Sequence, residues 1–270
     1  RSVRAVLFSE TGLQPISYRR VLLLLRNLKY LAKSDSERLV KDGLLDSLEL
    51  AREHKMSWVN DVVLVLSELP IPVYWKINAD SAINEKTVDQ LTVDVRHSME
   101  GCIQAELNAY SRTRDLLTDR TVFIKGKWTH DVMAFRLYLR VRNNKHRRAL
   151  IHAVLSGHSL AMERMRWAER YKPQVPRKWR LCRFCKTHLE DAIHALFVCD
   201  HPPLMPIRQD FFQKLYNSYP ELQGVYVDPG VFFKDALVKD KTIGILAKLA
   251  YEILEIFYAE PMLVINPDLY

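Results

Sequence analysis

The chain has 270 residues, 48% of them hydrophobic, and these values favour one large or two ordinary folded domains over a disordered chain. It contains only eight glycines and neither a GxGxxG nor a GxxxxGK[ST] pattern, which argues against a nucleotide-binding α/β enzyme. No apolar run reaches the roughly 18 residues of a membrane helix, so we expect no membrane partner. The chain begins at Arg1 without a methionine or a signal peptide, and we expect it to be part of a longer protein.

The net charge of +8 is concentrated in one block. Residues 136–186 hold fifteen lysines and arginines and two acidic residues, whereas the rest of the chain holds 25 basic and 30 acidic residues. Such a block repels itself unless an anionic partner covers it, which indicates RNA or DNA. The alternative is a solvated surface of a helical protein.

The first half of the chain reads as a series of helices. Apolar residues recur at helical spacing, and Ser34 with Glu37 and Thr87 with Gln90 have the pattern of a capping box. The expected helices are 15–32, 34–54, 58–70 and 87–117.

The second half continues in the same way, and residues 121–126 are its one stretch with modest strand character. Helices are expected at 131–141, 145–156, 158–171, 206–217 and 241–258, with residues 172–180 as a linker. The predicted fold class is all-α, a helical bundle with a small CCHC zinc knuckle. The expected segments are 1–33, 34–120, a basic helical region 121–180, the knuckle 181–205 and a C-terminal helical segment 206–270.

Three of the four cysteines lie within eighteen residues, in the pattern Cys182-x2-Cys185-x8-His194-x4-Cys199. Three thiolates and one imidazole are the ligand set of a closed structural zinc site, and soft thiolates disfavour magnesium and calcium. Because the protein would fill all four positions, no place is left for a reactive water, so the predicted zinc holds structure and does no chemistry.

Alternatives to this ligand set remain open. His188 and His201 are rival ligands, and a coincidence of buried cysteines is the competing interpretation. Cys102 stands alone on an apolar helix face and is expected in the core. Between the cysteine pairs we expect a short helix with Glu190 and Asp191 in its first turn, where the helix dipole favours acids.

Aromatic residues alternate with basic ones in the block, a combination that suits phosphates and unpaired bases. Trp167 is expected in the core, whereas Trp179 is the better candidate for stacking on a base. The tract 142–148 is basic enough to pass for a nuclear localisation signal. The candidate nucleic-acid-binding residues are Arg142, Lys145, Arg147, Arg148, Arg166, Arg170, Arg177, Lys178, Trp179, Arg180 and Arg183.

Residues 147–199, which join a basic helical stretch to CxxC, an acidic pair and His-x4-Cys, resemble the C-terminal zinc-binding module of LINE-type (non-LTR) retrotransposon reverse transcriptases. Residues 7–31 are similar to the segment that follows the palm of these polymerases, where the thumb begins. The resemblance implies that 1–33 ends a thumb-like region. It also implies that the knuckle and its basic approach grip template RNA or target DNA during target-primed reverse transcription.

The polymerase activity of that family does not carry over to these residues. Its palm needs paired aspartates, and no Asp-Asp occurs here, so whether the chain is itself an enzyme stays open. A nuclease core in the C-terminal segment would have to use Asp235, Asp240 and Lys241, and we do not expect these residues to form one. The resemblance implies a nuclear location or a cytoplasmic ribonucleoprotein, and the remainder of the polymerase as a partner. The alternative function is a zinc-stabilised protein-interaction module of a degenerate or domesticated element.

Overall fold

The computed structural model describes residues 4–35, 38–77, 83–109, 121–124, 127–166, 175–224 and 228–264. The chain divides into two units, one of residues 1–109 and 132–134 and the other of residues 110–131 and 135–270. The predicted segments 1–33 and 34–120 therefore both contribute helices to the first unit. The predicted fold class, a helical protein with a small Cys/His cluster, is confirmed.

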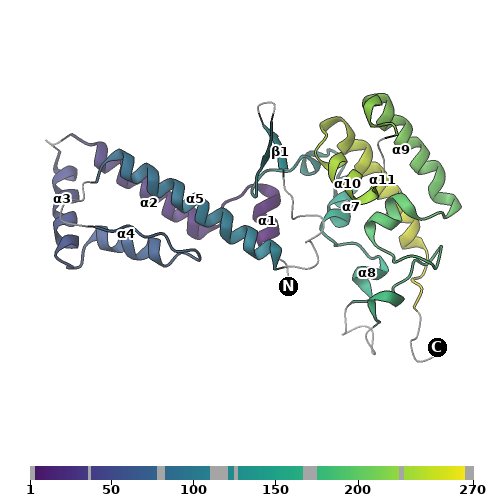
Figure 1. Ribbon diagram of the computed structural model, residues 1–270, viewed down its shortest axis with the longest axis horizontal. Helices are drawn as coiled ribbons and strands as arrows, with labels where there is room; N and C mark the ends of the chain where they lie inside the picture. Colours follow the sequence, from purple (N-terminus) through teal and green to yellow (C-terminus); the bar gives the residue numbers. More distant parts are fainter. Residues whose placement is uncertain are drawn as a thin grey trace. The chain divides into compact units, whose positions relative to one another are not determined.

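The first unit is an assembly of helices, and Figure 1 shows α2 and α5 running side by side along it. Its described helices are α1 (Arg4–Thr11), α2 (Ile16–Lys33), α3 (Leu39–Arg52), α4 (Trp58–Ser67) and α5 (Glu85–Asn108).

Helices α2 and α5 are antiparallel, and polar contacts at both ends fix their register. The Tyr18 hydroxyl, near the start of α2, lies 3.0 Å from the Ser98 hydroxyl and donates to the Ser98 carbonyl, 3.3 Å away. Toward the other end, Lys29 forms ion pairs with Glu85 at 3.1 Å and with Asp89 at 2.6 Å. Between these contacts, each helix buries one apolar stripe against its neighbours, as the 3.6-residue period predicts.

The sequence located α2 well and misplaced some neighbouring boundaries. Helix α1 was not predicted. Helix α3 begins at Leu39 and not at Ser34, because Ser34 ends α2, where its N–H and hydroxyl both donate to the Tyr30 carbonyl. The cap of α5 is Asn84, whose side chain accepts from the Thr87 N–H. The predicted end of this helix at residue 117 lies outside the described residues.

The second unit joins a hairpin to helices and short helical turns. The strands β1 (Thr121–Ile124) and β2 (Lys127–His130) pair antiparallel, with Thr121 opposite His130. The described helices are α7 (Asn144–Val154), α8 (Ala161–Arg164), α9 (Met205–Ser218), α10 (Pro229–Leu237) and α11 (Asp240–Ala259). The short turns are η1 (Leu137–Arg140), η2 (Arg177–Trp179), η3 (His194–Val198), η4 (Pro202–Leu204) and η5 (Pro220–Leu222).

Helix α11 forms the centre of the second unit. It contacts α7, α9, α10, η1 and η3, and it buries residues around most of its circumference, from Ile243 to Phe257. An apolar surface of this extent cannot be covered by one partner helix, which is why several elements surround it. The cluster of cysteines and histidine therefore rests on the main core of this unit and not at the end of a free arm.

Several predictions for this unit need correction. The stretch 131–141 forms only η1, and 158–171 forms the four-residue α8, with residues 167–171 outside the described part. Helix α10 was missed, although Asp228 caps it by accepting from the N–H groups of Gly230 and Val231. None of the described helices combines the length and the apolarity needed to cross a membrane.

Candidate metal centre

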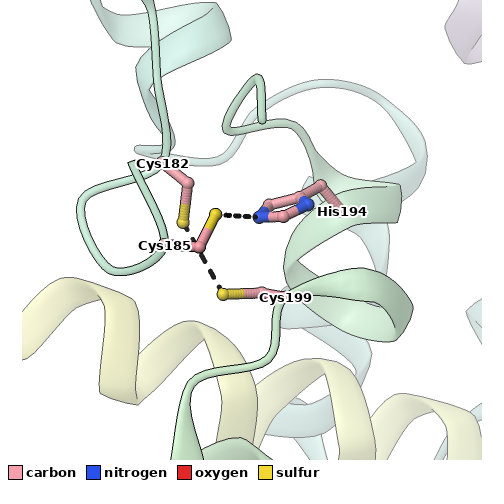
Figure 2. Close-up of side chains that lie close together, drawn as sticks. All are labelled: Cys182, Cys185, His194 and Cys199. Atoms are coloured by element: carbon pink, nitrogen blue, oxygen red, sulfur yellow. Dashed lines mark hydrogen bonds between the residues drawn. The ribbon is translucent and has the colours of Figure 1, made fainter. Parts of the chain in front are cut away.

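The first two cysteines lie on a tight loop closed by backbone hydrogen bonds. The Cys182 N–H donates to the His188 carbonyl at 2.8 Å, and the Lys186 N–H donates to the Cys182 carbonyl at 3.0 Å. Lys186 adopts a left-handed conformation with φ of 60° to turn the chain back. This closure holds the thiols of Cys182 and Cys185 near each other (Figure 2).

The other two members of the cluster lie at either end of a π-helical turn. His194 and Cys199 are five residues apart, a separation that in an α-helix would place their side chains about 140° apart around the axis. The Cys199 N–H donates instead to the His194 carbonyl at 2.8 Å, which is the i to i+5 bond of a π-helix and brings both side chains toward the same side. Asp191 caps the start of the turn by accepting from the His194 N–H at 2.8 Å.

Together these two segments form one cluster (Figure 2). The ligand atoms of Cys182, Cys185, His194 and Cys199 all lie within 4.8 Å of one another. The sulfurs of Cys182 and Cys199 are 3.7 Å apart, and the sulfur of Cys185 is 3.4 Å from Nε2 of His194. Cys182, Cys199 and His194 are buried, Cys185 is half-buried, and all four cysteines of the chain are free thiols. This arrangement is able to hold a metal ion, with His194 facing the cluster through Nε2.

Burial opposes ionisation of two of the thiols. It raises the pKa of Cys182 to about 12, even though the N–H groups of Cys185 and Phe184 donate to its sulfur, and it also raises the pKa of Cys199. A bound cation has to displace protons from these two thiols, so the affinity of the cluster for a metal falls as the pH is lowered.

Cys185 differs from its neighbours in the cluster. Burial acts to raise its pKa, but hydrogen bonds from Thr187 and His188 outweigh burial and bring the pKa of Cys185 down to about 5. The lowered pKa favours the thiolate form of Cys185, which is the form that binds a metal.

A buried arginine from α9 supports the π-helical turn. Arg208 is 6% exposed, and its Nε donates to the Leu196 carbonyl and its Nη2 to the Ala195 carbonyl, both at 2.8 Å, while its Nη1 donates to the Cys199 carbonyl. The pKa of Arg208 is lowered by burial, and the neighbouring Cys199 offsets only part of this shift. Its positive charge partly offsets the negative charge that three thiolates would bring. Sequence reasoning missed this residue, because nothing in the local pattern distinguishes it from a surface arginine.

A second buried arginine ties the cysteine loop to the rest of the unit. Arg183 forms a two-fold ion pair with Glu190, with nitrogen–oxygen distances of 2.6 and 3.0 Å, and it also donates to the carbonyls of Phe257 and Glu260. The predicted contact of Arg183 with nucleic acid does not fit this arrangement, because the side chain is 5% exposed and its guanidinium is bonded inside the protein. The helix-dipole role expected for Glu190 is wrong, and its neighbour Asp191 caps the turn instead.

Arg180 needs the same correction. It is 7% exposed and donates to the carbonyls of Val175 and Met162, so its predicted contact with a phosphate does not fit the structure. Trp179 is half-buried and packs against the apolar cluster of Ala161, Met165 and Val175, which leaves its ring partly covered and a poorer stacking surface than predicted.

The remaining basic candidates differ in exposure. Arg147 is half-buried and bonds to the Val141 carbonyl and the Asn144 side chain, and Arg166 is half-buried and paired with Glu163 at 3.2 Å. Arg170 lies outside the described residues, as do Trp167 and the first three residues of the linker, 172–174. The candidates that are exposed are Arg142, Lys145, Arg148, Arg177 and Lys178.

The rival histidines lie outside the cluster. His188 bonds to the Thr187 hydroxyl and stacks on the ring of His194, and His201 stacks on Phe184 with ring centroids 3.9 Å apart. Cys102 is half-buried on α5 in the first unit, where burial raises its pKa.

Comparisons of the chain with protein-family models, with curated proteins and with solved structures found no match.

Proposed function

We propose that this chain is the C-terminal, zinc-binding and nucleic-acid-binding portion of a non-LTR retrotransposon reverse transcriptase. In this role it positions RNA or target DNA for target-primed reverse transcription. The observation that carries the proposal is a closed cluster of three cysteines and one histidine in the same folded unit as exposed cations of the basic block. The assignment to this family and to target-primed reverse transcription rests on the resemblance of residues 147–199 to its zinc-binding module.

The distances within the cluster support zinc as the metal. Around a tetrahedral zinc with bonds of about 2.3 Å to sulfur and about 2.0 Å to nitrogen, two sulfurs lie about 3.8 Å apart and a sulfur and a nitrogen about 3.5 Å apart. The corresponding distances here are 3.7 Å between Cys182 and Cys199 and 3.4 Å between Cys185 and His194. Zinc bound in this way would hold the cysteine loop against the π-helical turn.

The start of α7 supports binding of a polyanion. Its first turn contains no acidic residue, although the positive end of the helix dipole favours acids there. Lys145, Arg147 and Arg148 occupy this end instead, so their charges add to the dipole and destabilise the free helix. A phosphate chain near these residues would be attracted by both the side chains and the helix terminus.

The exposed cations suit phosphate contacts and little sequence readout. Such contacts make affinity strongly dependent on salt. The logarithm of the binding constant falls with the logarithm of the salt concentration, with a slope of about −0.7 for each phosphate neutralised on a single strand. The proposed role is therefore to hold and orient the nucleic acid, with the polymerase chemistry supplied by another part of the parent protein. A nuclear location or a cytoplasmic ribonucleoprotein follows from this role.

A salt titration of binding to RNA and to DNA oligonucleotides, on the full chain with and without a chelator, tests the proposal. We expect the affinity to fall steeply with salt, and each glutamine substitution at Arg142, Arg177 or Lys178 to reduce the slope. The exposed Arg20 and Lys76 of the first unit provide matched control substitutions. An affinity that does not change between low and high salt would refute the proposal.

A protein-interaction module of a domesticated element is the second candidate. It is favoured by the finding that two of the predicted phosphate contacts, Arg180 and Arg183, bond within the protein. This candidate predicts metal binding without affinity for RNA beyond that of any protein of similar charge. The same titration therefore separates the two functions.

A further inference from the structure

A groove of about 360 Å³ lies between α7 and α11, formed by residues outside the metal cluster. Its volume falls within the range of about 300–1,000 Å³ typical of sites for small ligands. The lining residues recur every three or four positions on each helix, so two stripes of side chains face one space. The polar ones are Lys145, Arg148 and His152 from α7 and Tyr251, Glu255 and Tyr258 from α11.

We propose that this groove binds one unpaired nucleotide of a single-stranded RNA or DNA segment. The inference rests on the proposed function and adds the place and the form in which the nucleic acid is held. It also explains why aromatic and basic residues from separate parts of the chain meet here.

The cations of the groove lie on the α7 side. Lys145 and Arg148 are exposed, and the side chain of neither forms an ion pair or hydrogen bond with a described residue. Burial, followed by the nearby Arg148, lowers the pKa of His152, so this imidazole is neutral at pH 7 and can donate or accept a hydrogen bond. A phosphate placed here would meet two unpaired charges and the positive end of the α7 dipole.

The aromatic rings lie on the α11 side and are held in place. Tyr251 is half-buried and its ring centroid lies 5.2 Å from that of His146. The hydroxyl of Tyr258 accepts a hydrogen bond from the Ser159 N–H at 3.5 Å, while the residue stays 41% exposed. Rings restrained before binding offer stacking surfaces to a base at a lower entropic cost than free side chains.

The charge pattern orients the ligand and narrows its class. Glu255 is exposed on the α11 side and would repel a phosphate, but it can accept hydrogen bonds from a ribose hydroxyl or a base amino group. The phosphate therefore faces Lys145 and Arg148, and the base and sugar face α11. A ligand with negative charge at both ends, such as a free polyphosphate, does not fit this division.

The size of the groove favours an unpaired nucleotide over a duplex. Bases inside a duplex are stacked on both faces, so they cannot offer a face to Tyr251 or Tyr258. A groove of about 360 Å³ is comparable in size to one nucleotide. The groove should therefore discriminate between single strands and duplexes of the same sequence.

The test is photo-crosslinking of the full chain to a ten-residue oligouridylate carrying one 5-iodouridine, with peptide mapping by mass spectrometry. We expect crosslinks at Tyr251 or Tyr258, and weaker competition by a duplex than by a single strand. A thymidine decamer with one 5-iododeoxyuridine forms the second arm and tells whether RNA or DNA is preferred.

Matched substitutions complete the test. Tyr251→Ala should weaken binding of the oligouridylate at least about 5-fold, whereas Tyr251→Phe should keep most of the affinity because the ring remains. Tyr74→Ala, at an exposed tyrosine of the first unit, serves as the control. Full affinity in Tyr251→Ala, or crosslinks only outside the groove, would overturn the inference and leave the proposed function standing. No binding of any oligonucleotide would overturn both.

Discussion

The guanidinium of Arg183 and the carboxylate of Glu190 form an ion pair with almost no access to solvent, since their side chains are 5% and 0% exposed. Arg183 lies within the cysteine loop, one residue after Cys182, and Glu190 lies four residues before His194. Glu190 also accepts from the Ala161 N–H at 2.9 Å, so its carboxylate joins the loop to α8. The cysteine loop is thus attached to the second unit by a buried charge network as well as by any metal.

Replacing Glu190 with glutamine should therefore destabilise the second unit strongly. Loss of one partner leaves the Arg183 charge buried and unpaired, which costs about 3–5 kcal/mol. Urea unfolding of the metal-loaded protein measures this change in free energy. Glu85→Gln, which removes exposed ion pairs in the first unit, should cost far less, and equal effects of the two substitutions would contradict this account.

The cysteine cluster gives a prediction about stoichiometry. The full chain should contain one zinc ion, and Cys182→Ser should lose it, because a hydroxyl is a poor substitute for a thiolate ligand. Elemental analysis at neutral pH and the absorption spectrum of the cobalt-substituted protein report on this directly. Cys102→Ser is the matched control and should retain a full equivalent of metal, since Cys102 lies in the first unit. Metal-free protein whose cysteines are all freely alkylated would contradict the prediction.

The pattern of cysteines and histidine was readable from the sequence because metal ligands must come from a small set of residue types at short spacing. The roles of Arg180 and Arg183 were not readable, because their partners include backbone carbonyls as distant as Glu260. A local pattern shows that an arginine is present, and only the tertiary fold shows whether its charge faces water. For the same reason, the supporting role of Arg208 could not be predicted from the sequence.

The secondary-structure elements with a strong local pattern were predicted, and those that depend on tertiary packing were not. Helix α2 has a strong apolar period and was predicted within one residue at each end, whereas α10 is short, begins with Pro229 and Gly230, and was missed. The expected 131–141 helix became only η1, because its apolar residues serve tertiary packing and do not sustain a helical ladder. Residues 121–124 do form a strand, and their partner is the following segment Lys127–His130.

Arg208 should be sensitive even to a conservative change. Its guanidinium reaches three backbone carbonyls of the π-helical turn, a fork that the single ammonium of lysine cannot reproduce. Arg208→Lys should therefore loosen the turn that carries His194 and Cys199 and speed the release of metal. Transfer of zinc to a chromophoric chelator measures that rate. Arg20→Lys, at an exposed site of the first unit, should leave it unchanged, and equal rates in both variants would argue against a supporting role for Arg208.

His158 gives the protein a dependence of stability on pH that is separate from the metal ligands. Burial, followed by the nearby His152, lowers its pKa to about 4 from an ordinary value of 6.5. Below pH 6.5 the unfolded chain therefore takes up a proton that the folded chain refuses, so stability falls as the pH drops from 6.5 toward 4. From pH 7 to pH 5 the protonation of this group alone lowers the free energy of unfolding by about 2 kcal/mol.

His158→Asn keeps an acceptor for the Leu160 N–H without the titration, and it should lose correspondingly less stability over that interval in urea unfolding. Since acid also weakens thiolate binding to metal, both proteins should be compared with the metal removed. An identical fall in stability for the two proteins would show that His158 is not the titrating group.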